Sequence, residues 1–369
     1  MRKLLTCGAL LFMLMDCLNS VQAQDTLMML VGTYTYGGSR GIYTYRFNQS
    51  TGAAVLLDSL EMQNPSYLTA SDDGRLVYVV SETGDEKAAL NVVSLDKKGG
   101  MRQLGSALTG GADPCYVASN GQIALTANYS GGSMSVFNLT QQGTKATLRT
   151  RFLGSTGGPD PSRQETPHVH CVCFTPDERH VLATDFRADR ILSYRLEGQR
   201  LVADGVAARV SADSGPRHLT FSRDGRYAYL MSELSGKVTA FRYSDGRLQS
   251  IQEIASDSVG ARGGADIHLS PDGRFLYSSN RLKDEGIAIF AVDTATGLLT
   301  RRGYQPTGAH PRQFNITPNG RFLLCCCRDS DCIQVFRRDA ATGLLTDTHQ
   351  DIRVSKAVCV AWGGFKLNH

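Results

Sequence analysis

The sequence predicts an all-β fold, a β-propeller of seven four-stranded antiparallel blades. A tight-turn motif resembling Asp-Gly-Arg recurs along the chain, mostly 47 or 48 residues apart with one interval of 57. Its six occurrences are centred on Gly74, Gly121, Glu178, Gly225, Gly273 and Gly320. A repeat of this length, built from short strands, is typical of one propeller blade.

Each end of the chain supplies part of a further blade. Residues 27–34 and 41–47 alternate in the manner of strands, and they resemble the later strands of a blade that lacks its first. Residues 357–362 resemble a first strand with no later ones. We therefore predict that the two ends complete one blade together, which makes seven blades and leaves no exposed sheet edge at the closure.

The hairpin at residues 217–221 and 226–232 shows how one unit is organised. Its turn contains Asp224-Gly225, where glycine tolerates positive φ. Antiparallel pairing places Arg217 and Glu233 at the same edge. A proline marks most first-strand starts, because it lacks a backbone donor. The predicted starts are Pro65, Pro114, Pro167, Pro216 and Pro311, with Ala265 and Lys356 at the equivalent positions. Third strands are expected at 134–139, 191–196, 237–243, 287–292 and 333–337.

The N-terminus has the pattern of a secretory signal peptide. Arg2 and Lys3 precede an apolar run at 4–15, and Val21-Gln22-Ala23 resembles a cleavage site. We predict a signal peptide at 1–23 and one propeller domain at 24–369, periplasmic or secreted and free of the membrane after cleavage. Cys17 offers an alternative, a lipoprotein anchor, although Asp16 fits that processing poorly.

The composition excludes several classes of function. A formal net charge of +4 without a basic cluster argues against nucleic acid as a partner. The mature chain keeps eight cysteines without framework spacing, so most are expected to be buried apolar side chains. The run Cys325-Cys326-Cys327 can point at most two thiols to one face, and no metal or other cofactor is predicted. A propeller of this kind is stable alone, so a monomer is expected.

Aligning the units collects polar residues at one mouth of the channel that the first strands line. The predicted cations there are Arg217, Arg281, Arg312, Arg328, His168, His170 and His268. The predicted acidic and amide groups are Glu82, Asp185, Glu233, Asp266 and Asn128. Four guanidiniums favour an anionic ligand, because their forked donors match carboxylate or phosphate. The alternative is that they pair with the acids and only tie blades together.

The histidines have several interpretations. His168 and His170 are expected on one strand face near acids and arginines, which suits proton transfer near neutral pH. They could instead be packed histidines bonded to backbone carbonyls. A zinc site shared with Cys171 and Cys173 is disfavoured, because His170 and Cys171 point to opposite faces. His218 is expected on the face opposite Arg217, in a structural role.

These motifs resemble the seven-bladed propeller lactonase family, which includes propeller-type 6-phosphogluconolactonases and the fungal carboxymuconate cycloisomerase. No Gly-x-Ser-x-Gly elbow, P-loop or nucleotide fingerprint is present, so serine-hydrolase and phosphoryl-transfer chemistry are not supported. The likeness covers essentially the whole mature chain. The likeness rests on residues 31–35, 41–43, 163–170, 215–218, 279–281 and 311–312.

The resemblance implies a carboxylic-ester hydrolase that opens a small anionic or sugar-acid lactone without metal. It implies catalytic roles for Glu233, His168 or His170, Arg217 and Arg281, with Glu233 or His168 activating water. Arg312, Arg328, Asp266, His268, Asp185 and Asn128 are expected to bind substrate. Asp266 and Arg328 depart from the residues usual in the family, which leaves the lactone open. Two alternatives remain, a non-catalytic exported propeller that binds an anionic sugar or a protein, and a cycloisomerase acting on a carboxylated ring.

Overall fold

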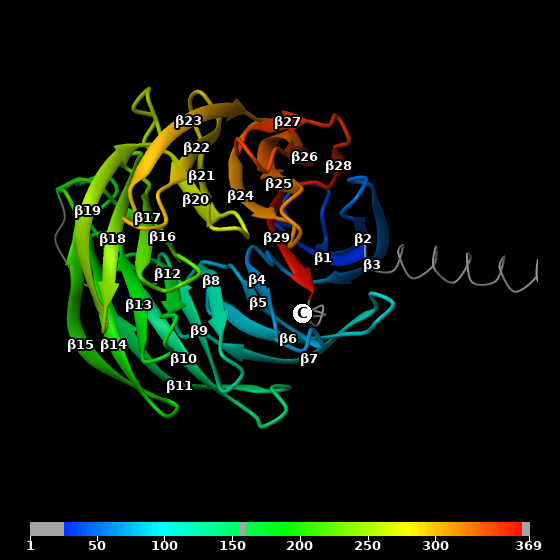
Figure 1. The fold of residues 1–369 in the computed structure, drawn as a ribbon. Helices are drawn as coiled ribbons and strands as arrows, with labels where there is room; N and C mark the ends of the chain where they lie inside the picture. The colour runs from blue at the N-terminus through cyan, green and yellow to red at the C-terminus, as the bar shows by residue number, and fades with distance from the viewer. Residues whose placement is uncertain (1–25, 155–158, 364–369) are drawn as a thin grey trace, which may run out of the picture.

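The computed structural model describes residues 26–154 and 159–363. The predicted signal peptide and Cys17 therefore lie outside the described residues. Figure 1 shows seven sheets arranged as blades in a ring, which confirms the predicted seven-bladed β-propeller. No helix in the described ranges is long and apolar enough to cross a membrane.

Six blades have four antiparallel strands, and the seventh has a short fifth strand in addition. We number the blades from the one that joins both chain ends. Blade 1 contains β29 (Ala357–Gly363), β1 (Thr26–Thr33), β2 (Gly41–Asn48) and β3 (Ala54–Glu61). Blade 2 contains β4 (Leu68–Ala70), β5 (Leu76–Ser81), β6 (Ala89–Leu95) and β7 (Met101–Leu108). Blade 3 contains β8 (Pro114–Ser119), β9 (Ile123–Asn128), β10 (Ser133–Leu139) and β11 (Ala146–Leu153).

The remaining four blades repeat this order. Blade 4 contains β12 (Val169–Phe174), β13 (His180–Asp185), β14 (Arg190–Glu197) and β15 (Arg200–Arg209). Blade 5 contains β16 (Pro216–Phe221), β17 (Tyr227–Ser232), β18 (Lys237–Ser244) and β19 (Arg247–Ala255). Blade 6 contains β20 (Gly264–Leu269), β21 (Phe275–Asn280), β22 (Gly286–Val292) and β23 (Leu299–Pro306). Blade 7 contains β24 (Pro311–Ile316), β25 (Phe322–Cys327), β26 (Cys332–Arg338), β27 (Leu345–Asp347) and β28 (Ile352–Arg353), with a short 3₁₀ turn at Arg328–Ser330.

The two ends of the described chain close the ring as predicted. Strand β29 pairs antiparallel with β1, with Leu30 opposite Ala361. In the described residues, seven apolar clusters each lie between two adjacent blades. Second strands such as β5 and β17 are buried at every residue, because both faces of their sheets are covered by neighbouring blades. The core of the ring therefore consists of these clusters between neighbouring blades.

A β-bulge recurs near the start of the first strands. The register shifts between Pro216 and His218 in blade 5, and similar shifts occur in blades 1, 3, 4, 6 and 7. A bulge adds one residue to a strand and changes which face the next side chains occupy. Strict alternation, on which the predicted grouping of mouth residues depended, therefore fails at this point of the blade.

The predicted strand starts are right in blades 3, 5 and 7 and are off by one to three residues in the other four; the first strands of blades 1 and 2 begin at Ala357 and Leu68 rather than at Lys356 and Pro65. In blade 4 the residue opposite Asp185 is Val169, two residues beyond Pro167. In blade 6 the residue opposite Asn280 is Gly264, one residue before Ala265. By this register His170 occupies in blade 4 the position that Arg217 occupies in blade 5. Likewise, Asp266 occupies in blade 6 the position that His218 occupies in blade 5.

Candidate active site

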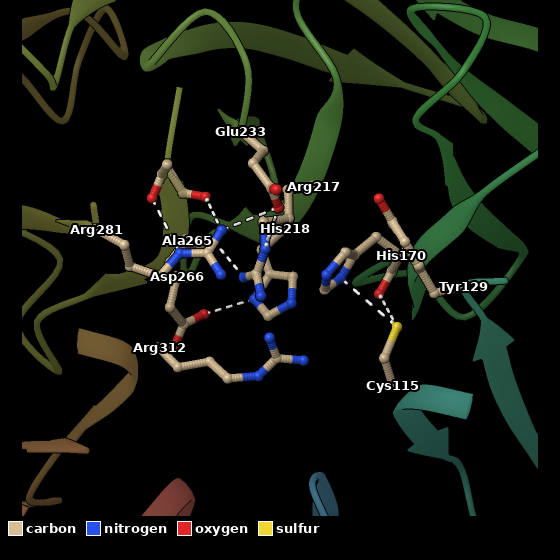
Figure 2. Close-up of polar contacts among 12 residues, drawn as sticks. Cys115, Tyr129, His170, Arg217, His218, Glu233, Ala265, Asp266, Arg281 and Arg312 are labelled. Carbon is tan, nitrogen blue, oxygen red and sulfur yellow. Dashed lines mark hydrogen bonds and ion pairs between the residues drawn. The ribbon is translucent and has the colours of Figure 1, made fainter. Parts of the chain in front are cut away.

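The channel mouth is organised around the carboxylate of Glu233, which follows β17. Arg163 Nη2 lies 2.6 Å from its Oε1. Arg217 Nε and Arg281 Nη2 each lie 3.0 Å from Oε2. Figure 2 shows Glu233, Arg217 and Arg281 converging from neighbouring blades. One buried carboxylate thus holds three guanidiniums together.

Backbone carbonyls of blade 6 fix two of these guanidiniums. Arg217 donates from Nη1 to the carbonyl of Ala265 at 2.7 Å. Arg281 donates to the carbonyls of Gly263 and Gly264, both at 3.0 Å. Guanidinium groups have rigid donor geometry, so two anchors of different kinds define their planes. The arginines are therefore positioned before any ligand arrives.

The same contacts keep Glu233 ionised. Burial opposes ionisation, but the charges of Arg281, Arg217 and Arg163 outweigh it and lower the pKa of Glu233 to about 2. A general base works best when its pKa lies near the working pH. Glu233 is therefore better suited to holding the arginines than to accepting a proton from water.

Arg312 forms a second, looser cluster at the same mouth. Its Nη2 lies 3.6 Å from Glu82 Oε1, and its guanidinium lies over the ring of Tyr34 at 5.3 Å. Glu82 is already engaged, since the Tyr34 hydroxyl donates to Oε1 at 2.8 Å and Ser66 donates to Oε2. Together the two clusters contain four guanidiniums and two carboxylates. This excess of two positive charges favours an anionic ligand.

His170 and His168 lie beside the arginines in different environments. His170 is buried, with Nδ1 3.7 Å from the Cys115 sulfur, and burial together with Arg217 lowers its pKa well below the ordinary value. His168 stacks on Tyr129 at 4.2 Å between ring centroids, and its Nδ1 lies 2.9 Å from the Tyr129 carbonyl. Burial lowers the pKa of His168 as well. Both imidazoles are therefore neutral at neutral pH and can accept a proton.

Asp266 and His268 lie deeper in the channel than predicted. Asp266 accepts hydrogen bonds from His218 Nδ1 at 2.7 Å and His268 Nε2 at 2.8 Å, and its side chain does not face the mouth. The register of blade 6 accounts for this, because its first strand begins one residue earlier than expected. His268 lines a separate cavity of about 250 Å³ below the mouth. The expectation that both bind substrate at the mouth is therefore corrected.

Asn128 and Asp185 are also absent from the mouth. Both are 0% exposed within their own blades. The Asn128 amide donates to the hydroxyls of Ser133 and Ser135, and Asp185 pairs with Arg190 at 3.0 Å. Each side chain ties the second strand of its blade to the third. Arg328 lies at the rim, where it pairs with Asp329 at 2.7 Å.

Two residues of the channel were missed from the sequence. Arg163 precedes β12 and has no counterpart in the repeat, so aligning the blades could not place it. Its position in the family-like segment 163–170 was the available signal. His218 was expected on the face opposite Arg217, but the bulge brings both side chains to the channel. Its ring lies 5.1 Å from that of His170.

Comparisons with known proteins agree with this architecture. Residues 28–362 match the family described as Lactonase, 7-bladed beta-propeller. A solved structure from Bacteroides uniformis, provisionally described as a 6-phosphogluconolactonase, is 58% identical with a TM-score of 0.90, covering 92% of this chain and 99% of that one. A 6-phosphogluconolactonase of Formosa agariphila is 33% identical over 343 residues, or 89% of this chain and 97% of that protein. The periplasmic gluconolactonase of Pseudomonas aeruginosa is 34% identical with a TM-score of 0.86, covering 91% and 99%.

Proposed function

Because the chain belongs to the seven-bladed β-propeller lactonase family, we propose that it is a carboxylic-ester hydrolase that opens a sugar-acid lactone at the channel mouth. The observation that carries this proposal is the cluster of Arg163, Arg217 and Arg281 around Glu233, beside two neutral histidines. Such a site offers fixed positive charge for a carbonyl oxygen and a proton acceptor for water.

In the proposed reaction, water attacks the lactone carbonyl carbon, and His168, whose pKa is lowered less than that of His170, accepts the proton that the water loses. The carbonyl oxygen gains negative charge, which the adjacent guanidiniums stabilise because they are already oriented. The ring C–O bond then breaks, and the leaving alkoxide takes a proton from the imidazolium. The product is a hydroxy acid that ionises at neutral pH. His170, which is buried beside Arg217, is the alternative base.

We further propose that the substrate is an unphosphorylated aldonolactone in the periplasm. The signal-peptide pattern at residues 1–23 supports export. The Pseudomonas aeruginosa relative is described as a periplasmic gluconolactonase, whereas other relatives are described as 6-phosphogluconolactonases. Sequencing the N-terminus of protein from a periplasmic extract tests the location, with Gln24 expected first.

Hydrolysis of gluconolactone and 6-phosphogluconolactone by the purified mature protein, with chelator present, tests the activity. Arg217→Lys is expected to lower kcat about a hundredfold, because lysine cannot reproduce the forked donor geometry. Arg338→Lys is the matched control, since buried Arg338 also pairs with one carboxylate, Asp272 at 3.0 Å, at the other end of the blades. This control should keep its kcat.

Three results would contradict the proposal. Wild-type turnover no faster than spontaneous hydrolysis on either lactone would favour the non-catalytic binding propeller. Equal kcat values for Arg217→Lys and wild type would remove the reaction from this mouth. Consumption of a carboxylated ring without release of a hydroxy acid would favour the cycloisomerase.

A further inference from the structure

The segment that carries Arg163 to the mouth is a closed turn, residues 160–164, which we call the strap. Asp160 Oδ1 accepts hydrogen bonds from the backbone N–H groups of Ser162 at 2.8 Å and Arg163 at 3.3 Å. The backbone N–H of Gln164 donates to the carbonyl of Asp160 at 2.7 Å. These contacts stabilise the shape of the strap, but they do not place it beside Glu233. Its position depends on what holds its two ends.

The end of the strap is fixed inside the protein by Gln164, which is buried. Its Nε2 donates to the carbonyl of Phe186 at 2.8 Å and to Asp189 Oδ1 at 3.0 Å. Asp189 Oδ1 also accepts from the backbone N–H groups of Ser214 at 2.9 Å and Gly215 at 2.8 Å. Breaking such a buried network leaves polar groups without partners, which is costly. This anchor therefore joins the strap firmly to blades 4 and 5.

The start of the strap is held by a charged side chain, Arg262, from the loop between β19 and β20. Its Nη2 lies 2.5 Å from Asp160 Oδ2, and its Nη1 lies 2.7 Å from Asp213 Oδ2. The Nη2 group also donates to Asp213 Oδ1 at 2.7 Å. An arginine suits this arrangement because its donors lie in one rigid plane and can bind two carboxylates at once. Since Asp160 precedes β12 and Asp213 precedes β16, one guanidinium links the loops of three blades.

The loop that carries Arg262 also holds a second arginine of the mouth. The carbonyls of Gly263 and Gly264 accept hydrogen bonds from Arg281, both at 3.0 Å. Arg262 itself has a φ of 57°. A residue with a side chain is uncommon in this left-handed region and is kept there when surrounding contacts require it. Residues 262–264 therefore contact both the strap that carries Arg163 and the guanidinium of Arg281.

We propose that Arg262 is a positioning residue for the hydrolysis, because its bridge between Asp160 and Asp213 holds the strap where Arg163 meets the Glu233 carboxylate. This role rests on the proposed function, in which guanidiniums that are already oriented stabilise the charge on the carbonyl oxygen. Arg262 acts only through Arg163, whose Nη2 lies 2.6 Å from Glu233 Oε1. Without the bridge, the strap keeps its buried anchor but loses the contact that fixes its other end.

Arg262→Gln tests this role by removing the charge and the fork. The Arg262 side chain is 41% exposed, so the variant is expected to fold. We expect kcat to fall about tenfold and KM to stay within about twofold of wild type, because a displaced catalytic group slows the reaction more than it weakens binding. Arg247→Gln is the matched control, since Arg247 is 50% exposed and pairs with Asp204 of the adjacent blade at 2.8 Å, at the turn end. Its kcat should be unchanged.

A double variant distinguishes positioning from a general effect on stability. If Arg262 acts through Arg163, then Arg163→Lys already loses what Arg262 supplies. The kcat of Arg163→Lys combined with Arg262→Gln should therefore lie within about twofold of that of Arg163→Lys alone. If Arg262 only joined the loops of neighbouring blades, the two losses would multiply.

Hydrogen exchange measured by mass spectrometry gives a readout that needs no turnover. Peptides that contain residues 160–164 should exchange faster in Arg262→Gln than in wild type, and at the wild-type rate in Arg247→Gln. Unchanged exchange of the strap, a kcat of Arg262→Gln within twofold of wild type, or losses that multiply in the double variant would each overturn the positioning role alone. Absence of wild-type turnover would instead overturn the proposed function, and the positioning role with it.

Discussion

The two ends of the blades use the same repeat in opposite ways. At the turn end, successive blades repeat one local network, in which Ser222 donates to Asp224 at 2.7 Å and Thr175 donates to Asp177 at 2.6 Å. At the mouth end, Arg217, His170 and Ala265 occupy equivalent positions in three adjacent blades. The turn end is therefore conserved between blades in structure and chemistry, whereas the mouth end keeps the structure and varies the chemistry.

The range of the contacts explains the difference. The Ser–Asp contacts within a turn join residues two to five apart, and only some turns also contact a neighbouring blade, as where Arg338 Nη2 lies 3.0 Å from Asp272. Contacts at the mouth cross between blades, as from Arg163 to Glu233, 70 residues apart, and from His218 to Asp266, 48 residues apart. Substitutions at the mouth should therefore affect several blades and the reaction together. Substitutions at the turns should affect only stability.

The largest expected effect is that of Glu233→Gln. Removing this charge leaves three guanidiniums without their shared partner, and breaking a buried ion pair costs about 3 to 5 kcal/mol. Chemical denaturation should show a loss of that size, and kcat should fall more than binding weakens. Glu253→Gln, in a partly exposed pair with Lys237, is the control and should change stability by less than about 1 kcal/mol. Equal losses of stability in the two variants would show that Glu233 at the mouth stabilises the fold no more than a partly exposed ion pair does.

Low pH should remove the stabilising contribution of the Glu233 charge from the wild-type protein. The folded pKa of Glu233 is about 2 against an ordinary 4.5, so its stabilisation is complete above about pH 4.5 and is lost as the pH falls toward 2. A shift of this size corresponds to about 3 kcal/mol. The stability difference between wild type and Glu233→Gln, measured by denaturation at several pH values, should shrink across this window. A constant difference would show that ionisation of Glu233 does not stabilise the fold.

The sequence predicted the turn end better than the mouth because turn chemistry is local. The motif around Gly225 predicts its own conformation, and the structure has φ of 71° there. Ring closure was also predictable, since the apolar alternation at both chain ends indicates which strands are missing. Arg217 and Glu233 were placed together because the turn between them fixes their register.

The errors at the mouth have several physical origins. A bulge leaves no marker in sequence alternation, so His218 was assigned to the wrong face, and the first strand of blade 6 begins one residue early, so Asp266 was assigned to the wrong depth. The expectation that a proline starts each first strand was wrong in blade 4, where Pro167 lies two residues before the strand. Arg163 lies outside the repeat altogether. Depth in the channel depends on contacts between blades, which the repeat does not encode.

Arg312→Lys should have an intermediate effect. Arg312 is the least neutralised guanidinium of the mouth clusters, with Glu82 at 3.6 Å, so it is free to contact an anionic substrate. Losing its forked geometry should raise KM for the lactone about tenfold, or about 1.4 kcal/mol, with kcat changed less. Arg321→Lys, at an exposed turn, is the matched control. An unchanged KM for Arg312→Lys would place substrate binding elsewhere.

The smallest effects should come from two serines that occupy opposite ends of the blades. Ser222 bonds with Asp224 and accepts from the backbone N–H of Tyr227 at 2.9 Å, whereas Ser66 donates to Glu82 at the mouth. Ser222→Ala should cost about 1 kcal/mol in denaturation and leave kcat and KM unchanged, because its network is confined to one turn. Ser66→Ala should raise KM, because Glu82 released from Ser66 is free to neutralise Arg312. A KM change in Ser222→Ala, or none in Ser66→Ala, would show that the two ends are not functionally separate.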